Sequence, residues 1–166
     1  MTLPSDAELN AIGVLQRRLI EARIVAPLLE ALGAEFGRAR VLAIAGEVIA
    51  RVARAQGEQM QAAVGGRSLP LFASTLDRWT ADDALAIEVR EATADTYAFD
   101  VTRCRYAEMY RELGIPELGA VLSCQRDGAL MEGFNPDVTL QRTGTILGGA
   151  ARCDFRYVRR PDAPAP

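Results

Sequence analysis

The chain has 166 residues, of which 49% are hydrophobic and 25% charged, so it is long and apolar enough to form one domain with a sizeable core. It contains no His and no Lys, which excludes a His general base, a His metal ligand and a Lys Schiff base within the chain. The net charge of −3, without a basic stripe, argues against binding to nucleic acid or to a membrane surface.

The N-terminal sequence, MTLPSDAELN, carries acidic residues where a signal peptide requires basic and then apolar ones, and no run of about 18 apolar residues follows. We therefore expect a cytoplasmic protein with a single domain over residues 1–160 and a disordered tail over residues 161–166. In that compartment the three Cys are expected to be reduced, serving as core residues, metal ligands or reactive thiols.

The first third of the chain has the apolar spacing of three successive helices, over about residues 5–26, 27–37 and 38–64. Ser5 and Glu8 form a capping box that opens the first helix, and Pro27 suits the first turn of the second. Gly65 and Gly66 end the third helix. The apolar stripes of these helices form the core, or a homodimer face if they are wider than one domain can cover.

The pattern then changes to the alternation that is typical of β-strands. A first hairpin is predicted over residues 84–92 and 96–102. Two helices are predicted next, over about residues 105–113 and 116–132. A second hairpin, around Gly148 and Gly149, is predicted over residues 138–146 and 152–158. This order indicates an α+β fold, with N-terminal helices packed on a small four-stranded antiparallel sheet made of two hairpins separated by two helices.

Cys124 and Asp127 are the first candidates for chemistry, because a spacing of three residues puts both side chains on one face of a helix. A carboxylate beside a thiol normally raises the pKa of the thiol, so Asp127 suits the role of acid or base toward a substrate or a water molecule. The alternative is structural, with Cys124 as a small core residue and Asp127 as a polar surface residue.

The other two cysteines flank the predicted sheet. Cys104 stands where the first hairpin runs into a helix, so either the backbone N–H groups of the helix N-terminus stabilise its thiolate or it is a buried structural residue. On the last strand, alternation places Cys153, Phe155 and Tyr157 on one face, which we expect to be the face toward the helices, and Asp154 on the other.

A cation and a metal site are further candidates. Arg142 is predicted in mid-strand with Thr143 and Thr145 near it, and an Arg on a sheet face can hold a carboxylate through two parallel hydrogen bonds. Its alternative role is to cover apolar surface with its stem. The three Cys and Asp127 are acceptable zinc ligands, but the spacing of the Cys matches no zinc knuckle.

Several runs of the C-terminal part, taken together, resemble the L-2-amino-thiazoline-4-carboxylic acid hydrolase family. The runs are Arg103–Tyr110, Glu112–Gly119, Cys124-x-x-Asp127, Glu132–Pro136, Arg142-Thr143-x-Thr145 and Gly149-x-x-x-Cys153-Asp154-Phe155-Arg156-Tyr157. The likeness is strong over about the last two-fifths of the chain and holds only in outline for the N-terminal helices.

This resemblance implies a cofactor-independent hydrolase that opens a carbon–nitrogen bond in a small cyclic amidine or amide, such as 2-amino-thiazoline-4-carboxylate, and gives an N-carbamoyl cysteine. With His and Lys absent, Cys124 is the expected nucleophile, Asp127 moves the proton and Cys153 is a second thiol at the site. A water activated by Asp127 is the alternative nucleophile. Arg142 is expected to hold the substrate carboxylate. The remaining substrate-binding candidates are Thr143, Thr145, Cys104 and Asn135.

The order of elements also resembles, more distantly, the four-vinyl-reductase type domain, which implies an alternative function as a non-catalytic small-molecule binding or sensor domain. In sensor members of that family, zinc is held by a helix Cys, by Glu-x-x-Cys on one strand and by a Cys on the next. Cys124 and Cys153 fit the first and last positions, but Arg142 and Thr145 fall where Glu and Cys would be. We therefore expect a small-molecule ligand and no bound metal, with zinc as the alternative.

Overall fold

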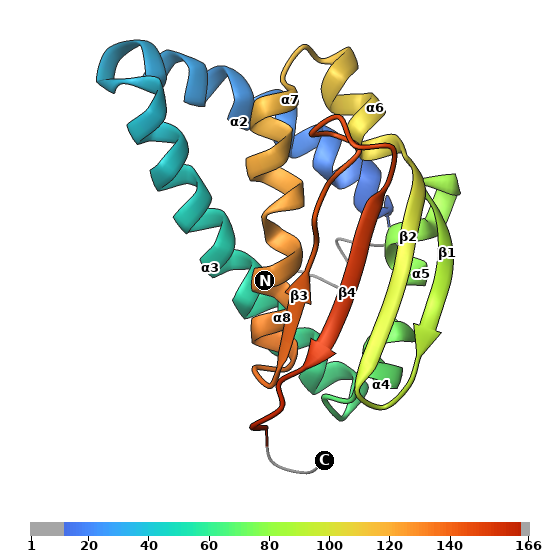
Figure 1. Cartoon of the computed structure of the whole chain (residues 1–166). Coiled ribbons are helices and arrows are strands. Elements are labelled where there is room, and N and C mark those ends of the chain that lie inside the picture. Colours follow the sequence, from blue (N-terminus) through green and yellow to red (C-terminus); the bar gives the residue numbers. More distant parts are fainter. Residues whose placement is uncertain (1–11, 164–166) are drawn as a thin grey trace.

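The structure is a computed structural model and describes residues 12–163. The predicted capping box at Ser5 and Glu8 lies outside the described residues. Two long helices come first, α2 (Val14–Phe36) and α3 (Arg38–Val64), and they turn back on each other at Gly37, whose φ of 91° is readily adopted only by glycine (Figure 1). No helix among the described residues has both the length and the apolar character needed to cross a membrane.

Pro27 lies inside α2, so the prediction of two separate helices on either side of it was wrong. A proline in a helix interior removes one backbone donor and crowds the preceding turn, which usually breaks or kinks the helix. Here the Pro27 ring is exposed, whereas Ala22 and Ala26 are buried, and this packing carries the helix through the proline. The third predicted helix is confirmed at both of its ends.

Three short helical segments connect α3 to the sheet. They are α4 (Leu69–Ala73), α5 (Asp77–Thr80) and the 3₁₀ turn η2 (Ala81–Asp83). Ser68 caps α4 by accepting a hydrogen bond from the N–H of Leu71 at 3.4 Å. The Phe72 ring of α4 meets the ring of Tyr157 edge-on, with 4.9 Å between their centroids, and so attaches this segment to the sheet.

The sheet has four antiparallel strands in the order β1-β2-β4-β3, and one of its faces is covered by helices (Figure 1). The strands are β1 (Leu85–Ala92), β2 (Thr96–Cys104), β3 (Val138–Gln141) and β4 (Cys153–Arg159). The predicted α+β fold, with N-terminal helices and two antiparallel pairs separated by helices, is therefore confirmed.

Between the two pairs of strands the chain forms α6 (Arg105–Glu112) and then a column of three helical segments. The column consists of α7 (Pro116–Gly119), the π-helical η3 (Ala120–Cys124) and α8 (Arg126–Phe134). The column begins at the predicted Pro116 and ends two residues beyond the predicted boundary. Cys124 closes the π-helical segment, and π-helical turns are frequent at functional sites.

The predicted strand over residues 138–146 was wrong in its second half, because β3 ends at Gln141. Residues 142–152 form a loop. The Asp154 carboxylate accepts the backbone N–H groups of Thr143 and Gly144 at 3.0 and 2.9 Å, and the hydroxyl of Thr143 at 2.7 Å. These backbone N–H groups therefore bind a side chain and do not continue the hydrogen bonding between β3 and β4. As a result, Arg142 lies outside the sheet.

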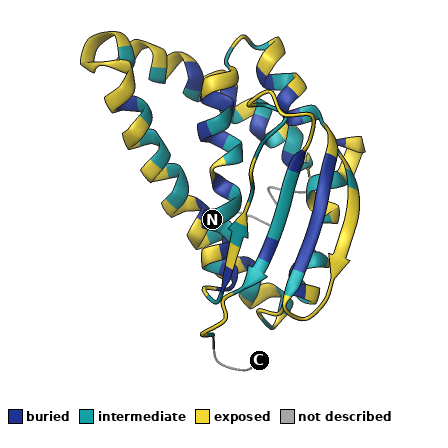
Figure 2. Cartoon of the chain, viewed as in Figure 1, coloured by how far each residue is buried: buried dark blue, intermediate teal, exposed yellow. Residues whose placement is uncertain are grey.

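Helices α3 and α8 cross at backbone contact, and glycines at the crossing allow it. A Cβ atom on Gly57 would lie 2.1 Å from the carbonyl oxygen of Leu130, and one on Gly133 would lie 2.0 Å from that of Arg54. The buried residues around the crossing and along β2 and β4 form the dark interior of the fold (Figure 2). This close approach fixes α8 against α3 and so sets the direction in which the α8 side chains point.

Candidate active site

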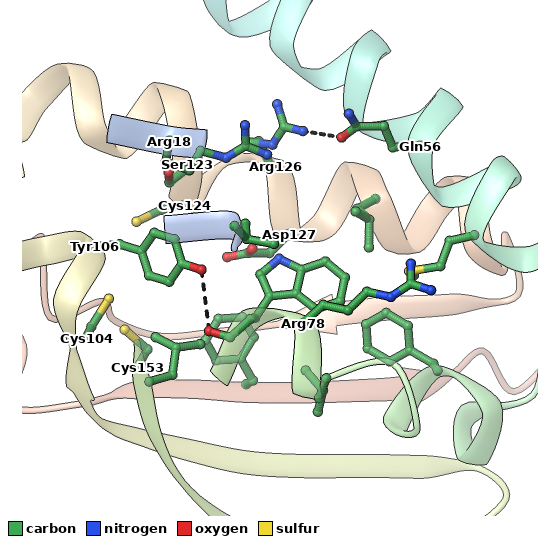
Figure 3. A pocket seen from close by; sticks show the side chains of 18 of the residues that line it. Arg18, Gln56, Arg78, Cys104, Tyr106, Ser123, Cys124, Arg126, Asp127 and Cys153 are labelled. Carbon is green, nitrogen blue, oxygen red and sulfur yellow. Dashed lines mark hydrogen bonds between the residues drawn. The ribbon is translucent and has the colours of Figure 1, made fainter. Parts of the chain in front are cut away.

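A cavity of about 510 Å³ lies between the inner face of the sheet and the helices. Its walls are mostly apolar and come from α2, α3, the α4–α5 segment, strands β1, β2 and β4, and the helical segments α6, η3 and α8. Five of the residues predicted for the site line it: Cys104, Cys124, Asp127, Arg142 and Cys153. In Figure 3 Asp127 lies between Arg126 on one side and Cys153 on the other. The volume is within the ~300–1,000 Å³ range of small-molecule sites.

Asp127 is held by Arg142 across the cavity wall. The Nη1 of Arg142 donates to Oδ2 of Asp127 at 2.6 Å, and its Nη2 donates to the Cys124 carbonyl oxygen at 2.8 Å. The guanidinium also lies over the Phe155 ring, 4.9 Å from its centroid. Arg142 is the first residue after β3 rather than a mid-strand residue, and from there its side chain reaches α8.

The electrostatics of Asp127 are set by two opposing effects. Burial raises the pKa of this carboxyl group, and the charge and hydrogen bonds of Arg142 lower it, with the net result that the pKa is raised above its ordinary value. The side chains of Asp127 and Arg142 retain 31% and 16% exposure. A carboxylate with a raised pKa is a better proton acceptor at neutral pH than an ordinary one.

All three cysteines are free, and their thiols are protonated near neutral pH. Burial, followed by the Asp127 charge, raises the pKa of Cys124 to about 12. Burial raises the pKa of Cys104 to about 11 and outweighs the N–H groups of the α6 N-terminus, so Cys104 fits the buried alternative rather than the thiolate. Burial also raises the pKa of Cys153, whose Sγ accepts the Ile146 N–H at 3.1 Å.

The predicted alternation along β4 is confirmed. Cys153, Phe155 and Tyr157 all line the cavity on the face toward the helices. Asp154 lies on the opposite face and binds the loop after β3. Although burial acts to raise the pKa of Asp154, the hydrogen bonds from Thr143 and Gly144 lower it to about 2.

The remaining three substrate-binding candidates lie outside the lining of the cavity and make local contacts. The Thr143 hydroxyl binds Asp154, and the Thr145 Oγ1 accepts the Gly148 N–H at 3.0 Å. Asn135 follows α8, where its Nδ2 donates to the Arg67 carbonyl at 2.7 Å and its Oδ1 accepts the Asp137 N–H at 2.9 Å. A role for these residues in substrate binding stays a prediction.

Two buried arginines of the cavity were missed from the sequence. Arg18 on α2 and Arg126 on α8 are only 8% and 7% exposed, and both line the cavity. Arg18 forms an ion pair with Glu21, and Arg126 donates to Oε1 of Gln56. The signal in the sequence was weak: Arg18 shares a helical row with Val14, at a spacing of four residues, which would normally be read as a core row.

No group of three or more His, Cys, Asp or Glu side chains within residues 12–163 is arranged to hold a metal ion. The cavity thiols instead lie beside a carboxylate that already binds Arg142. The absence of a cofactor stays a prediction.

A family model described as L-2-amino-thiazoline-4-carboxylic acid hydrolase matches residues 17–157. The chain belongs to this family. The resemblance seen in the C-terminal motifs is thereby confirmed and extends over the N-terminal helices. A search of the curated proteins finds no match.

Membership of the L-2-amino-thiazoline-4-carboxylic acid hydrolase family places the chain in a family named for a hydrolase. The cavity offers the groups that such a reaction needs without His or Lys. It has one carboxylate with a raised pKa, fixed by an arginine, and neutral thiols beside it. The mostly apolar walls limit the water around a group bound inside, which strengthens electrostatic interactions there.

Proposed function

We propose that the protein hydrolyses a small cyclic amidine that carries a carboxylate, such as 2-amino-thiazoline-4-carboxylate, to an N-carbamoyl cysteine. The observation that carries this proposal is the Asp127 carboxylate, held by Arg142 on the wall of a mostly apolar cavity. The family match supports the substrate class, and the cavity volume suits a single five-membered ring with its substituents.

In the proposed reaction Asp127 is the general base. It takes a proton from water as the water oxygen bonds to the amidine carbon, and it passes this proton to the ring nitrogen as the C=N bond becomes single. Asp127 then takes the proton of the new hydroxyl group as the carbonyl forms. The electron pair of the ring carbon–sulfur bond leaves with sulfur, which receives the proton.

The atom balance changes one part of the expectation from the sequence. To give an N-carbamoyl cysteine, both nitrogens must stay on the former amidine carbon, so the bond that breaks is the carbon–sulfur bond of the ring. The same addition of water to a lactam would break a carbon–nitrogen bond. The proposal therefore concerns attack at an amidine or amide carbon, and the leaving atom depends on the ring.

Cys124 was the expected nucleophile, with an activated water as the alternative. The structure supports the water route, because a thiol whose pKa is raised to about 12 carries almost no thiolate at neutral pH. Asp127 can deprotonate either nucleophile, but water needs no covalent intermediate. We place Cys124 in the wall against the substrate, where it shapes the site, and Cys153 in the opposite wall.

The test is incubation of the purified protein with 2-amino-thiazoline-4-carboxylate, with detection of the product thiol and of a mass gain of one water. We expect Asp127→Asn to lose at least ~100-fold in kcat, in line with the contribution of a general base. The matched control is Asp154→Asn, since Asp154 lies on the other face of β4 and should retain activity.

Variants of Cys124 separate the two nucleophiles. The water route predicts that folded Cys124→Ala keeps at least about a tenth of the activity, consistent with the loss of packing alone. An inactive, folded Cys124→Ala together with a covalent substrate adduct in the parent protein would contradict the water route. Stoichiometric binding of the amidine without turnover would contradict the hydrolase proposal and support the sensor-type alternative.

A further inference from the structure

We propose that Arg126, with Arg18 beside it, binds the carboxylate of the substrate, a role that the sequence had suggested for Arg142. This inference rests on the proposed function, because it names the part of the same cavity that recognises the charged group. Figure 3 shows Arg18 and Arg126 on one side of Asp127, with Cys104 and Cys153 on the other. The reacting ring would then lie between the arginines and the thiols.

The first support is the charge balance at Arg126. Its side chain is 7% exposed and donates to Gln56, and it forms no ion pair with any carboxylate among residues 12–163. A guanidinium buried without a counter-charge is unfavourable. Burial and the neighbouring charge of Arg18 together lower the pKa of Arg126 to about 10. An anionic ligand would offset both the cost of burying the Arg126 charge and its repulsion by Arg18.

The second support is that Arg142 is already occupied. Its two terminal nitrogens donate to Asp127 and to the Cys124 carbonyl, so its planar fork is directed at the protein. A substrate carboxylate placed on Arg142 would have to displace Asp127, the proposed base. Arg126 has the same fork, which suits two parallel hydrogen bonds to a carboxylate, and it lines the cavity.

The third support is the position of Arg126 in the cavity. Arg126 and Asp127 both line it, and the two groups interact electrostatically. A substrate anchored by its carboxylate at Arg126 would therefore place its ring in the same cavity as the Asp127 carboxylate. An anchor at this distance from the reacting carbon supplies binding and orientation, while the chemistry belongs to Asp127.

The test compares 2-amino-thiazoline-4-carboxylate with uncharged 2-amino-thiazoline as substrates of the parent protein and of Arg126→Gln. We expect KM for the carboxylate to rise at least ~30-fold with little change in kcat, consistent with the loss of a charge-assisted pair. Activity toward the uncharged ring should stay the same or rise. Arg103→Gln, which removes an exposed arginine paired with Glu108, is the matched control and should change neither.

Binding measurements distinguish failure of this inference from failure of the hydrolase proposal. Calorimetric titration of the carboxylate and the uncharged ring requires no turnover. A protein that binds the carboxylate more tightly through Arg126 but converts nothing would overturn the hydrolase proposal and leave the carboxylate site standing. If folded Arg126→Gln binds the carboxylate as tightly as the parent does, the carboxylate site is wrong.

A different observation carries a second inference: α2 and α3 each expose a row of large apolar side chains, and we propose that a second copy of the chain covers this apolar face. The residues of this apolar face are Ile20, Ile24, Leu28, Leu32 and Phe36 on α2 and Ile44, Val48 and Val52 on α3. The exposed helices stand away from the sheet (Figure 2). The cavity is lined by other residues of these helices.

The two rows of the apolar face are distinct from the residues that pack into the core. Val25 and Leu29 on α2 and Ile49 on α3 pack inward, and the exposed rows fall one residue before these positions. The eight side chains expose on the order of 700 Å², close to the ~800 Å² that each partner buries in a standard interface.

The charges around the apolar face favour a second copy as its occupant. Three arginines and four glutamates are exposed on these helices and form no ion pair within residues 12–163: Arg23, Arg40, Arg51, Glu30, Glu35, Glu47 and Glu58. A two-fold interface brings identical patches together, so a patch that carries both signs in similar numbers can complement itself. A partner of one predominant charge would leave about half of these groups unpaired.

The test is the mass of the purified full chain by light scattering at micromolar concentration. We expect a dimer for the parent protein and a monomer for Leu28→Glu, with Val89→Glu as the control. Val89 is equally apolar and exposed but lies on β1, so its replacement should leave the dimer intact. A monomeric parent protein, or a Leu28→Glu variant that stays dimeric, would overturn the inference.

Discussion

The cavity contains two arginine regions that differ in one respect. Around Arg142 the guanidinium is bound by Asp127, a carboxylate of the same chain. Around Arg126, Glu21 pairs with Arg17 and Arg18, and Arg126 itself forms no ion pair among the described residues. The first region satisfies its own charge and fixes a functional group. The second keeps a net positive charge that is available to a ligand. Arg142 thus positions the proposed base, whereas Arg126 is the proposed binding site of the substrate carboxylate.

The difference also has consequences for stability. Removing one partner of a buried ion pair leaves the other charge without compensation, which costs more than the pair itself contributes. Removing a buried charge that has no partner should instead raise the free energy of unfolding, because it removes the cost of burying an uncompensated charge. Loss of the arginine should therefore lower the free energy of unfolding in the Arg142 region and leave it unchanged or raise it in the Arg126 region.

The largest expected effect on stability is that of Arg142→Met. The variant leaves the partly buried Asp127 without its cation, and we expect a loss of about 2–3 kcal/mol in the free energy of unfolding, measured by urea denaturation. A Met side chain keeps most of the apolar contact with Phe155. The double variant with Asp127→Asn should recover a large part of the loss, and strict additivity of the two changes would contradict a coupled pair.

Arg126→Gln should have an effect of the opposite sign. Because Arg126 has no carboxylate partner among the described residues and lies beside Arg18, we expect the free energy of unfolding to stay the same or to rise by up to about 1 kcal/mol. The same denaturation experiment measures it. A loss as large as that of Arg142→Met would show that the two regions do not differ in the way described.

Stability and activity should depend on pH in opposite ways through Asp127. The native pKa of this group is raised, so the native state binds the proton more tightly than the unfolded state, and Asp127 adds stability as the pH falls through the raised pKa. Activity should follow the opposite course, since the general base must be ionised. Removing Arg142 should move the acidic limb of the kcat profile to higher pH, and an unchanged limb would argue against Asp127 as the base.

The smallest effect is expected at Asp154, outside both regions. Its pKa is lowered to about 2, so it contributes stability above its ordinary pKa and loses that contribution as the pH falls toward 2. Asp154→Asn should cost about 1 kcal/mol by weakening the hydrogen bonds that hold the loop after β3. Activity at neutral pH should change little, and a loss comparable to that of Asp127→Asn would contradict its placement outside the site.

Much of the fold could be predicted from the sequence, because the change from helical spacing to alternation is strong and glycines or prolines mark most boundaries. The exceptions have local causes. Pro27 signals a helix start, but packing of the neighbouring alanines carries α2 past it. The residues after Gln141 have a strand-like pattern, but the Asp154 side chain takes their backbone donors.

The carboxylate and the thiols of the site could be predicted from the sequence, but the partners of its arginines could not. The spacing of Cys124 and Asp127 and the alternation at Cys153 depend only on local geometry, and these side chains do line one cavity. The partners of the arginines depend on tertiary packing. The sequence offered Arg142 as a carboxylate binder, and only the tertiary structure shows that Arg126 is buried and has no carboxylate partner among the described residues.

The most direct test is steady-state kinetics of Arg142→Met and Arg126→Gln on 2-amino-thiazoline-4-carboxylate, measured together with the parent protein. Because Arg142 holds the proposed base and Arg126 is the proposed anchor of the substrate carboxylate, Arg142→Met should lower kcat and Arg126→Gln should raise KM. If both folded variants changed the same kinetic parameter by similar factors, the two arginine regions would be equivalent and the two proposed roles would be wrong.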